Sequence, residues 1–129
     1  MKSPEFLTLA EVLEIHHAQI DRYGGSQGIR DRGLLESALA VPEASFGGDY
    51  LHPTLFAMAA AYAYHVAENQ PFIDGNKRTA LGAALVFLEM NGVSIDDPKG
   101  RLYEAMMAIA ARTLYKDGLA ALFKELTKN

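Results

Sequence analysis

Two long apolar segments, separated by a short polar one, constrain the fold of this chain more than any other feature. Residues 50–67 are YLHPTLFAMAAAYAYHVA, residues 79–90 are TALGAALVFLEM, and ENQPFIDGNKR lies between them at 68–78. Apolar runs of this length with few strand signals are typical of helices that are buried on most sides. We therefore predict a central pair of helices, about 53–69 and 76–91, joined by the polar loop.

Further helices are predicted on both sides of this pair, and no strand alternation or internal repeat is present. At 129 residues the chain fits a single all-α domain spanning 1–129, a helical bundle around the central pair. Before the central pair, we expect a helix that starts at a capping box, Thr8 to Glu11, and stops near 22–28, and a second helix capped by Asp31 and ended by Pro42. A loop or short hairpin is expected over 43–52. After the pair, we expect a helix from Asp97-Pro98 to about Tyr115 and, after a break at Lys116-Asp117-Gly118, a last helix over about 119–127.

Composition excludes several classes of function. The chain contains no cysteine, so zinc–thiolate sites, thiol catalysis and disulfide frameworks are excluded, and a reducing, cytoplasmic location is expected. A formal net charge of −4 argues against a broad nucleic-acid surface, and direct DNA binding is not expected. The N-terminal segment does not resemble a signal peptide, and the run 55–67, which carries His65, is too short for a membrane span.

The polar loop carries the residues that suit an anion site. Helix N-termini expose unpaired N–H groups at the positive end of the helix dipole, and Gly75 at this entry lets an anion approach the backbone. Asn76 can cap the helix or donate to an oxygen, while Lys77 and Arg78 supply a point charge and a bidentate fork. Asp74 would repel a bare phosphate but is suited to hold Mg²⁺ that bridges it to phosphate oxygens. The loop is therefore a candidate nucleotide-phosphate site.

A purely structural interpretation explains the same residues. Asp and Asn are ordinary helix caps, Asp-Gly is an ordinary turn, and adjacent cations are often simply solvated. Phe72 is more often a core residue than a ligand contact. The Walker A, dinucleotide-binding, His-Glu-x-x-His and EF-hand patterns are all absent. The chemistry of the loop alone leaves both interpretations open.

The segment QPFIDGNKRTA resembles the signature of the Fic/Doc family, whose core is His-x-Phe-x-Asp/Glu-Gly/Ala-Asn-Gly/Lys-Arg. The segments IHHAQIDRYGGSQGIRDRGLLESALA and ALVFLEMNGV resemble the Doc branch, the death-on-curing toxins. The resemblance covers most of the chain and its central motif is specific. It implies a helical Fic/Doc domain with a nucleotide site at the motif.

The resemblance also implies roles for single positions. Phe72 matches the buried aromatic that anchors the loop, and Asp74 matches the acid that holds Mg²⁺. The residues that match the phosphate-binding part of the motif are Gly75, Asn76, Lys77 and Arg78. Lys77 stands where AMP-transferring Fic enzymes have glycine, and Leu81 stands where they have a second arginine. This pattern favours the Doc branch, which transfers the terminal phosphate of ATP to a protein hydroxyl, the known case being a threonine of elongation factor Tu.

One position departs from the family pattern. The motif histidine, taken to accept the proton of the attacking hydroxyl, is replaced by Gln70. A glutamine amide cannot act as a base near neutral pH, and general-base help is worth about 10²–10⁴ in rate. We therefore expect a nucleotide site with impaired turnover. The replacement is either natural divergence or a detoxifying change, and the second is favoured because an active growth-arrest toxin is hard to express.

The resemblance implies partners as well. Doc-type toxins are neutralised by a small antitoxin whose disordered segment folds into a groove on the toxin, and the stretch 43–52 would be the flap that aligns the target segment. The alternatives are an AMP-transferring enzyme, disfavoured by Lys77 and Leu81, and a non-catalytic module that binds nucleotide or antitoxin, favoured by Gln70. We expect His65 to be a hydrogen-bonded core histidine, not a catalytic one.

Three further predictions concern residues outside the motif. His16 is expected to lie on the surface or in packing contacts. His52 precedes Pro53 in the stretch that would form the flap, where it would face the target. Arg30 is expected to belong to a solvated basic rim.

Overall fold

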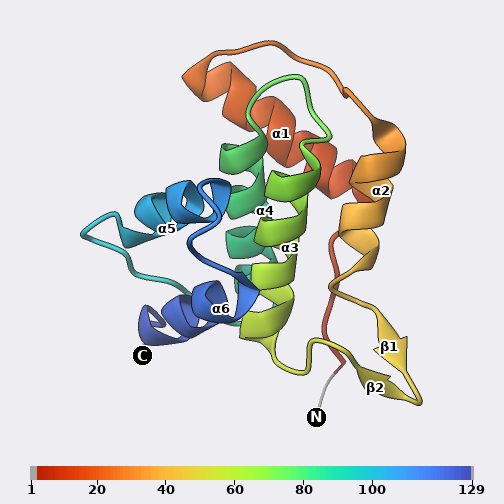
Figure 1. The fold of residues 1–129 in the computed structure, drawn as a ribbon, viewed down its shortest axis with the longest axis vertical. Helices are drawn as coiled ribbons and strands as arrows, with labels where there is room; N and C mark the ends of the chain where they lie inside the picture. Colours follow the sequence, from red (N-terminus) through yellow and green to blue (C-terminus); the bar gives the residue numbers. More distant parts are fainter. Residues whose placement is uncertain (1–2, 129) are drawn as a thin grey trace.

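The computed structural model describes residues 3–128, and the all-α class is confirmed in this part of the chain (Figure 1). A two-stranded hairpin is the only sheet recorded within these residues. The elements are α1 (Leu9–Tyr23), α2 (Arg32–Ala40), β1 (Ser45–Phe46), β2 (Asp49–Tyr50), α3 (Leu55–Asn69), α4 (Asn76–Met90), α5 (Arg101–Ala110) and α6 (Lys116–Glu125).

Helices α3 and α4 lie side by side at the centre of the fold, as the two apolar segments predicted (Figure 1). α3 begins at Leu55, two residues later than predicted, because the Thr54 side chain accepts the N–H of Ala57 and so caps the helix there. α1 begins at the predicted capping box, with the Thr8 hydroxyl and the Glu11 carboxylate each accepting the other residue's N–H.

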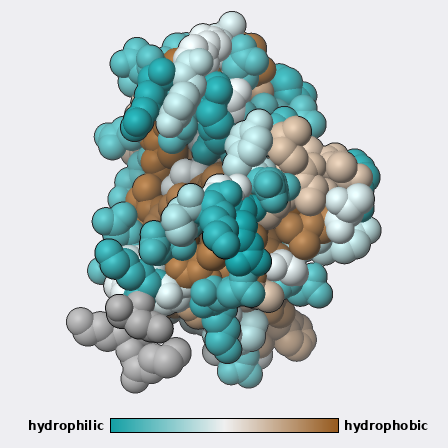
Figure 2. Space-filling view, turned by 90° about the vertical axis from the view of Figure 1, so that its left-hand side faces the viewer, coloured by the Kyte–Doolittle hydropathy of each residue, from teal (hydrophilic) through white to brown (hydrophobic). Residues whose placement is uncertain are grey.

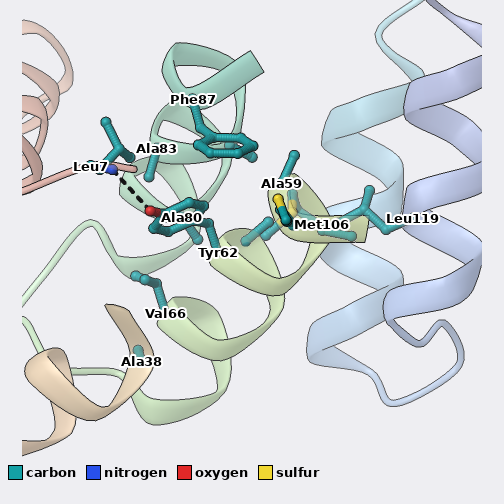
Figure 3. Close-up of a cluster of buried hydrophobic side chains, with 14 of the residues drawn as sticks. Leu7, Ala38, Ala59, Tyr62, Val66, Ala80, Ala83, Phe87, Met106 and Leu119 are labelled. Carbon is teal, nitrogen blue, oxygen red and sulfur yellow. Dashed lines mark hydrogen bonds between the residues drawn. The ribbon is translucent and has the colours of Figure 1, made fainter. Parts of the chain in front are cut away.

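The core is built around α3, whose consecutive alanines allow close packing against its neighbours. Tyr62 is fully buried, and its hydroxyl accepts the backbone N–H of Leu7 at 2.9 Å (Figure 3). Side chains from all six helices belong to one hydrophobic cluster, including Met106 of α5 and Leu119 of α6. Within residues 3–128, no helix combines the length and the apolar character that a membrane crossing requires.

The predicted bounds of the last two helices are wrong. α5 begins at Arg101, not at Asp97, because the Asp97 carboxylate accepts the N–H groups of Arg101 and Leu102 and thereby caps the helix from a distance. It ends at Ala110, since Arg112 adopts a left-handed conformation (φ 63°) that stops helix propagation.

α6 begins at Lys116, so the segment Lys116-Asp117-Gly118 forms its first turn and does not break the chain before the helix. Gly118 packs closely on Leu114, because a Cβ atom at this position would lie 2.5 Å from the Leu114 Cδ1 atom. The glycine is therefore a packing residue here, not a helix breaker.

The segment 43–52 forms the short hairpin that the Gly-Gly pair allowed. Ser45 pairs with Tyr50 and Phe46 with Asp49 in an antiparallel register. The turn residues Gly47 and Gly48 both have positive φ. The hairpin projects from the body of the fold near the start of α3 (Figure 1), and the Phe46 side chain is 82% exposed.

Candidate functional site

The motif loop connects the end of α3 to the start of α4, and the segment before α2 braces it. Gln70 ends α3 in a left-handed conformation (φ 46°, ψ 56°) that is uncommon for a residue other than glycine. The carbonyl of Pro71 accepts the N–H groups of Arg30 and Asp31, and Ile29 forms a β-bridge with Phe72. Unusual backbone conformations of this kind persist where the surrounding structure holds them, and they concentrate at functional sites.

Arg30 is exposed, as expected, and its side chain also holds the same loop, a role that the sequence did not indicate. Its Nε donates to the Gln70 carbonyl at 2.7 Å, and one terminal nitrogen donates to the Asn69 carbonyl at 2.9 Å. These carbonyls belong to the last turn of α3, where helix geometry leaves acceptors unpaired. Arg30 therefore fixes the backbone at position 70 from 40 residues away in the chain.

Phe72 is the buried aromatic residue of the motif loop. It is 1% exposed, and its ring stacks on the imidazole of His16 with the ring centroids 3.8 Å apart. His16 Nε2 lies 2.8 Å from the Asp74 carbonyl oxygen, which can only accept, so Nε2 carries the proton. His16 is buried and links α1 to the motif, a role that the sequence indicated only as packing.

Asn76 closes the loop on itself. Its side-chain oxygen accepts the N–H of Phe72 at 2.9 Å, and its side-chain nitrogen donates to the Phe72 carbonyl at 3.0 Å. Asn76 is thus the first residue of α4 and not its cap. Its side-chain nitrogen carries a second N–H, so either that group or the backbone N–H can contribute to ligand binding.

The N-terminus of α4 is open to a ligand. Gly75 is the N-cap residue, and no side chain caps the N–H groups of the first turn. Gly75 has φ 77°, and a Cβ atom there would lie 2.9 Å from Ile20 Cδ1 of α1, so both backbone conformation and packing require glycine. An uncapped first turn provides N–H donors and a positive dipole end, which together favour an anion.

Asp74 has an oxygen available for a cation. Its Oδ2 accepts the N–H of Ser26 at 2.9 Å, whereas no hydrogen bond is recorded for its Oδ1 to any residue within 3–128. The carboxylate is exposed on the cleft described below. No group of three or more potential metal ligands occurs within residues 3–128. Asp74 therefore fits a hard cation such as Mg²⁺ that takes its remaining ligands from phosphate oxygens and water.

Arg78 and Lys77 differ in how they are held. One terminal nitrogen of Arg78 donates to the Gly24 carbonyl at 3.1 Å, and the guanidinium lies over the Tyr23 ring, 5.3 Å from its centroid. The Nε atom of Arg78 is buried and has no partner in the described part of the chain. Lys77 is exposed, and its ammonium has no recorded ion pair with any residue from 3 to 128. The Arg78 guanidinium is therefore held in one orientation, whereas the Lys77 side chain can extend toward a ligand.

These residues share one cleft of about 540 Å³, between the motif loop and α5. Gln70, Asp74, Gly75, Asn76, Lys77, Arg78 and Leu81 line it on the motif side, and Tyr103, Met107 and Arg112 are among its residues on the opposite side. Figure 2, which views the molecule from the side that carries α5, shows apolar surface between hydrophilic margins. The structure thus brings together every predicted site residue except Phe72, which lies beneath the loop.

His65 lies outside this cleft. It is half-buried on α3 and hydrogen-bonded to Lys116, so it is a bonded histidine as predicted but does not belong to the main core. It lines a second cleft with His52 and Lys116. This cluster was not predicted, because the three residues are far apart in the chain.

Comparisons with known proteins agree with these features. The model of the Fic/DOC family matches residues 6–88. The chain is 41% identical over 101 residues to Toxin Doc of Mycolicibacterium smegmatis (strain ATCC 700084 / mc(2)155), covering 77% of this chain and 78% of that one. It is 39% identical over 87 residues to Protein kinase doc of Escherichia phage P1, covering 67% of this chain and 68% of that one.

Proposed function

Because this chain belongs to the Doc branch of the Fic/DOC family, we propose that it is the toxin of a toxin–antitoxin pair and a phosphotransferase of the protein kinase type. The proposed reaction moves the γ-phosphate of ATP to a serine or threonine hydroxyl of a translation factor similar to elongation factor Tu. The observation that supports it best is the single cleft that joins the uncapped N-terminus of α4 to Asp74, Lys77 and Arg78.

In this proposal the chain's own residues hold the phosphates. The N–H groups of the first turn of α4 bind phosphate oxygens, Arg78 presents donors from a fixed direction, and Lys77 neutralises charge on the transferring group. Mg²⁺, held by the free Asp74 oxygen and the phosphates, would supply further charge neutralisation. The substrate hydroxyl oxygen bonds to the γ-phosphorus as the bond to the bridging oxygen breaks, and ADP leaves.

The hydroxyl proton must leave during this step, and position 70 is where the family places its acceptor. Gln70 lines the cleft, and the Arg30 contact fixes its backbone. A neutral amide cannot take the proton, so the proton has to pass to water or to the phosphate itself. We propose that turnover is lower than in a histidine form by about 10²–10⁴, the usual range for general-base help.

Two alternatives remain distinct from this proposal. Transfer of AMP from the α-phosphate is disfavoured by Lys77 and Leu81, both of which line the cleft in the place of the Fic-type glycine and arginine. A non-catalytic module that binds nucleotide or antitoxin is favoured by Gln70 alone. The antitoxin partner itself is inferred from the relative named Toxin Doc.

The decisive experiment restores histidine and follows the label. Gln70→His and the unchanged protein are incubated with elongation factor Tu and ATP labelled at either the α- or the γ-phosphate. We expect label on the factor from γ-labelled ATP only, with the histidine form faster by about 10²–10⁴. Label from α-labelled ATP only would support AMP transfer, and no label from either, with no growth arrest on expression, would exclude the enzyme for this target.

A further inference from the structure

A second cleft, of about 430 Å³, opens where the N-terminus of α6 meets α3, and it shares no lining residue with the motif cleft. Figure 1 shows α6 beginning against the flank of α3. The cleft walls are apolar and aromatic: Ala57, Tyr64, Tyr115 and Ala120. A volume of this size suits a small molecule or the end of a chain.

Three basic side chains converge in this cleft. The Lys116 ammonium donates to Nε2 of His65 at 2.9 Å and to Nε2 of His52 at 3.2 Å. Burial, together with the nearby Lys116 charge, lowers the pKa of His65 to about 4 and also lowers the pKa of His52. Both imidazoles are therefore neutral at pH 7, and Lys116 carries the positive charge of the cluster.

That charge has no acidic partner in the part of the chain that the structure describes. No ion pair involves Lys116 within residues 3–128, and the carboxylate of Asp117, which also lines the cleft, is exposed and accepts the N–H of Gly118. Lys116 is half-buried, and this burial lowers the pKa of its ammonium because it disfavours the charged form. A partly buried charge is normally paired, because leaving it unpaired in an apolar setting is costly.

We propose that this cleft binds a carboxylate carried on a small apolar or aromatic body, with the carboxylate on Lys116 and the apolar part against Tyr64 and Tyr115. An ammonium has three donors, and the two imidazoles use two of them. Lys116 is also the first residue of α6, so the positive end of the helix dipole adds to the attraction. One cation without an arginine fork, between apolar walls, suits a carboxylate better than a phosphate.

The site is independent of the proposed phosphotransfer, so it can be tested in the protein without ATP. The full chain is titrated with 3-phenylpropionate while the imidazole NMR signals of His52 and His65 are followed. The neutral isostere 3-phenylpropanamide serves as the matched ligand. We expect saturable shifts with the acid and at least about ten-fold weaker binding of the amide, because the amide carbonyl can still accept from the Lys116 ammonium but lacks the negative charge of the carboxylate.

A second ligand, N-acetylphenylalanine, distinguishes the two possible sources of the carboxylate, which are the carboxyl end of a peptide and a free acid. Tighter binding of this compound would identify the carboxyl end of a peptide as the source, and tighter binding of 3-phenylpropionate would identify a free acid. Either result supports a carboxylate site.

Variants on α6 provide the control. Lys116→Gln should abolish binding of the acid, whereas Lys124→Gln, an exposed lysine on the same helix outside the cleft, should leave it unchanged. Circular dichroism checks that both variants fold. If Lys116→Gln does not fold, the comparison of acid with amide in the unchanged protein decides. Equal binding of acid and amide, no saturable shift at millimolar concentration, or unchanged binding in a folded Lys116→Gln variant would overturn the proposal.

Discussion

Asp74 serves the motif through its backbone and its side chain separately. Its carbonyl oxygen accepts a hydrogen bond from the Nε2–H of His16, and its Oδ2 accepts one from the N–H of Ser26. These two bonds set the position of the residue, and they leave Oδ1 for a ligand. A cation held by one protein carboxylate takes its remaining ligands from phosphate oxygens and water, so the phosphates supply contacts that the protein does not. Metal and nucleotide should therefore bind together.

The substitution Asp74→Asn tests this dependence. The amide oxygen can still accept from Ser26, but the charge that attracts Mg²⁺ is lost. Calorimetry should show roughly ten-fold weaker binding of ATP in the presence of Mg²⁺, because a contact to a charged group is removed. ATP binding in EDTA should not weaken. Asp49→Asn, on the exposed hairpin, is the matched control. Equal affinity for ATP with Mg²⁺ in the Asp74 variant and the control would exclude Asp74 as the metal ligand.

At the scale of elements, the approach of α1 to the start of α4 positions the motif. Ile20 of α1 lies where a side chain at position 75 would be, and the left-handed φ of Gly75 turns the chain into α4. Gly92, just after α4, has a similar φ of 86° but open space around its missing Cβ atom. Gly92 therefore requires glycine only for its left-handed φ, whereas Gly75 requires it both for its φ and for the space that Ile20 fills.

Gly75→Ala and Gly92→Ala should therefore differ in stability. Gly92→Ala should lower the free energy of unfolding by about 1 kcal/mol, because only the left-handed conformation is unfavourable for alanine there. Gly75→Ala adds a clash with Ile20 and should lower it by about 2–4 kcal/mol in all. The free energy of unfolding from urea titration measures both. Equal losses for the two variants would mean that Ile20 moves aside without cost.

Some elements and contacts could be predicted from sequence, and others could not. The α3 and α4 pair follows from local apolar runs, and the start of α1 follows from the capping box at Thr8. The end of α5 depends on the conformation of Arg112, for which the sequence has no local signal. The position of the motif loop between α3 and α4 is a local feature and was predictable, whereas His16 and Arg30 contact the loop across 58 and 40 residues of chain. Such contacts are set by tertiary packing, which a linear pattern does not encode.

At the scale of the whole molecule, the N-terminal segment is tied to the central helix by one buried hydroxyl. Burial raises the pKa of Tyr62 to about 12, although the N–H that Leu7 donates lowers it somewhat. The folded protein therefore keeps this proton at a pH where the unfolded chain, with a pKa near 10, has lost it. Since the unfolded state then binds fewer protons, stability must fall as the pH rises through this window. That the chain forms a single domain, with this segment as part of it, stays a prediction.

Tyr62→Phe should remove that dependence on pH. At pH 8 the variant should lose about 1–3 kcal/mol of unfolding free energy, because the buried N–H of Leu7 is left without an acceptor. Between pH 10 and 12 the unchanged protein should lose up to about 1.4 kcal/mol per pH unit more than the variant does. Denaturant titrations at pH 8, 10 and 11 measure the difference. Parallel loss in the two proteins above pH 10 would show that Tyr62 is not the group responsible.

The two hydrogen bonds by which the Arg30 side chain clamps the end of α3 go only to the backbone carbonyls of Asn69 and Gln70. The side chain at position 70 therefore contributes nothing to that clamp and can be exchanged without loosening it. Histidine and glutamine codons differ by a single nucleotide. In genetic terms, position 70 can change between histidine and glutamine by one reversible point mutation, while the rest of the gene continues to encode the same loop contacts.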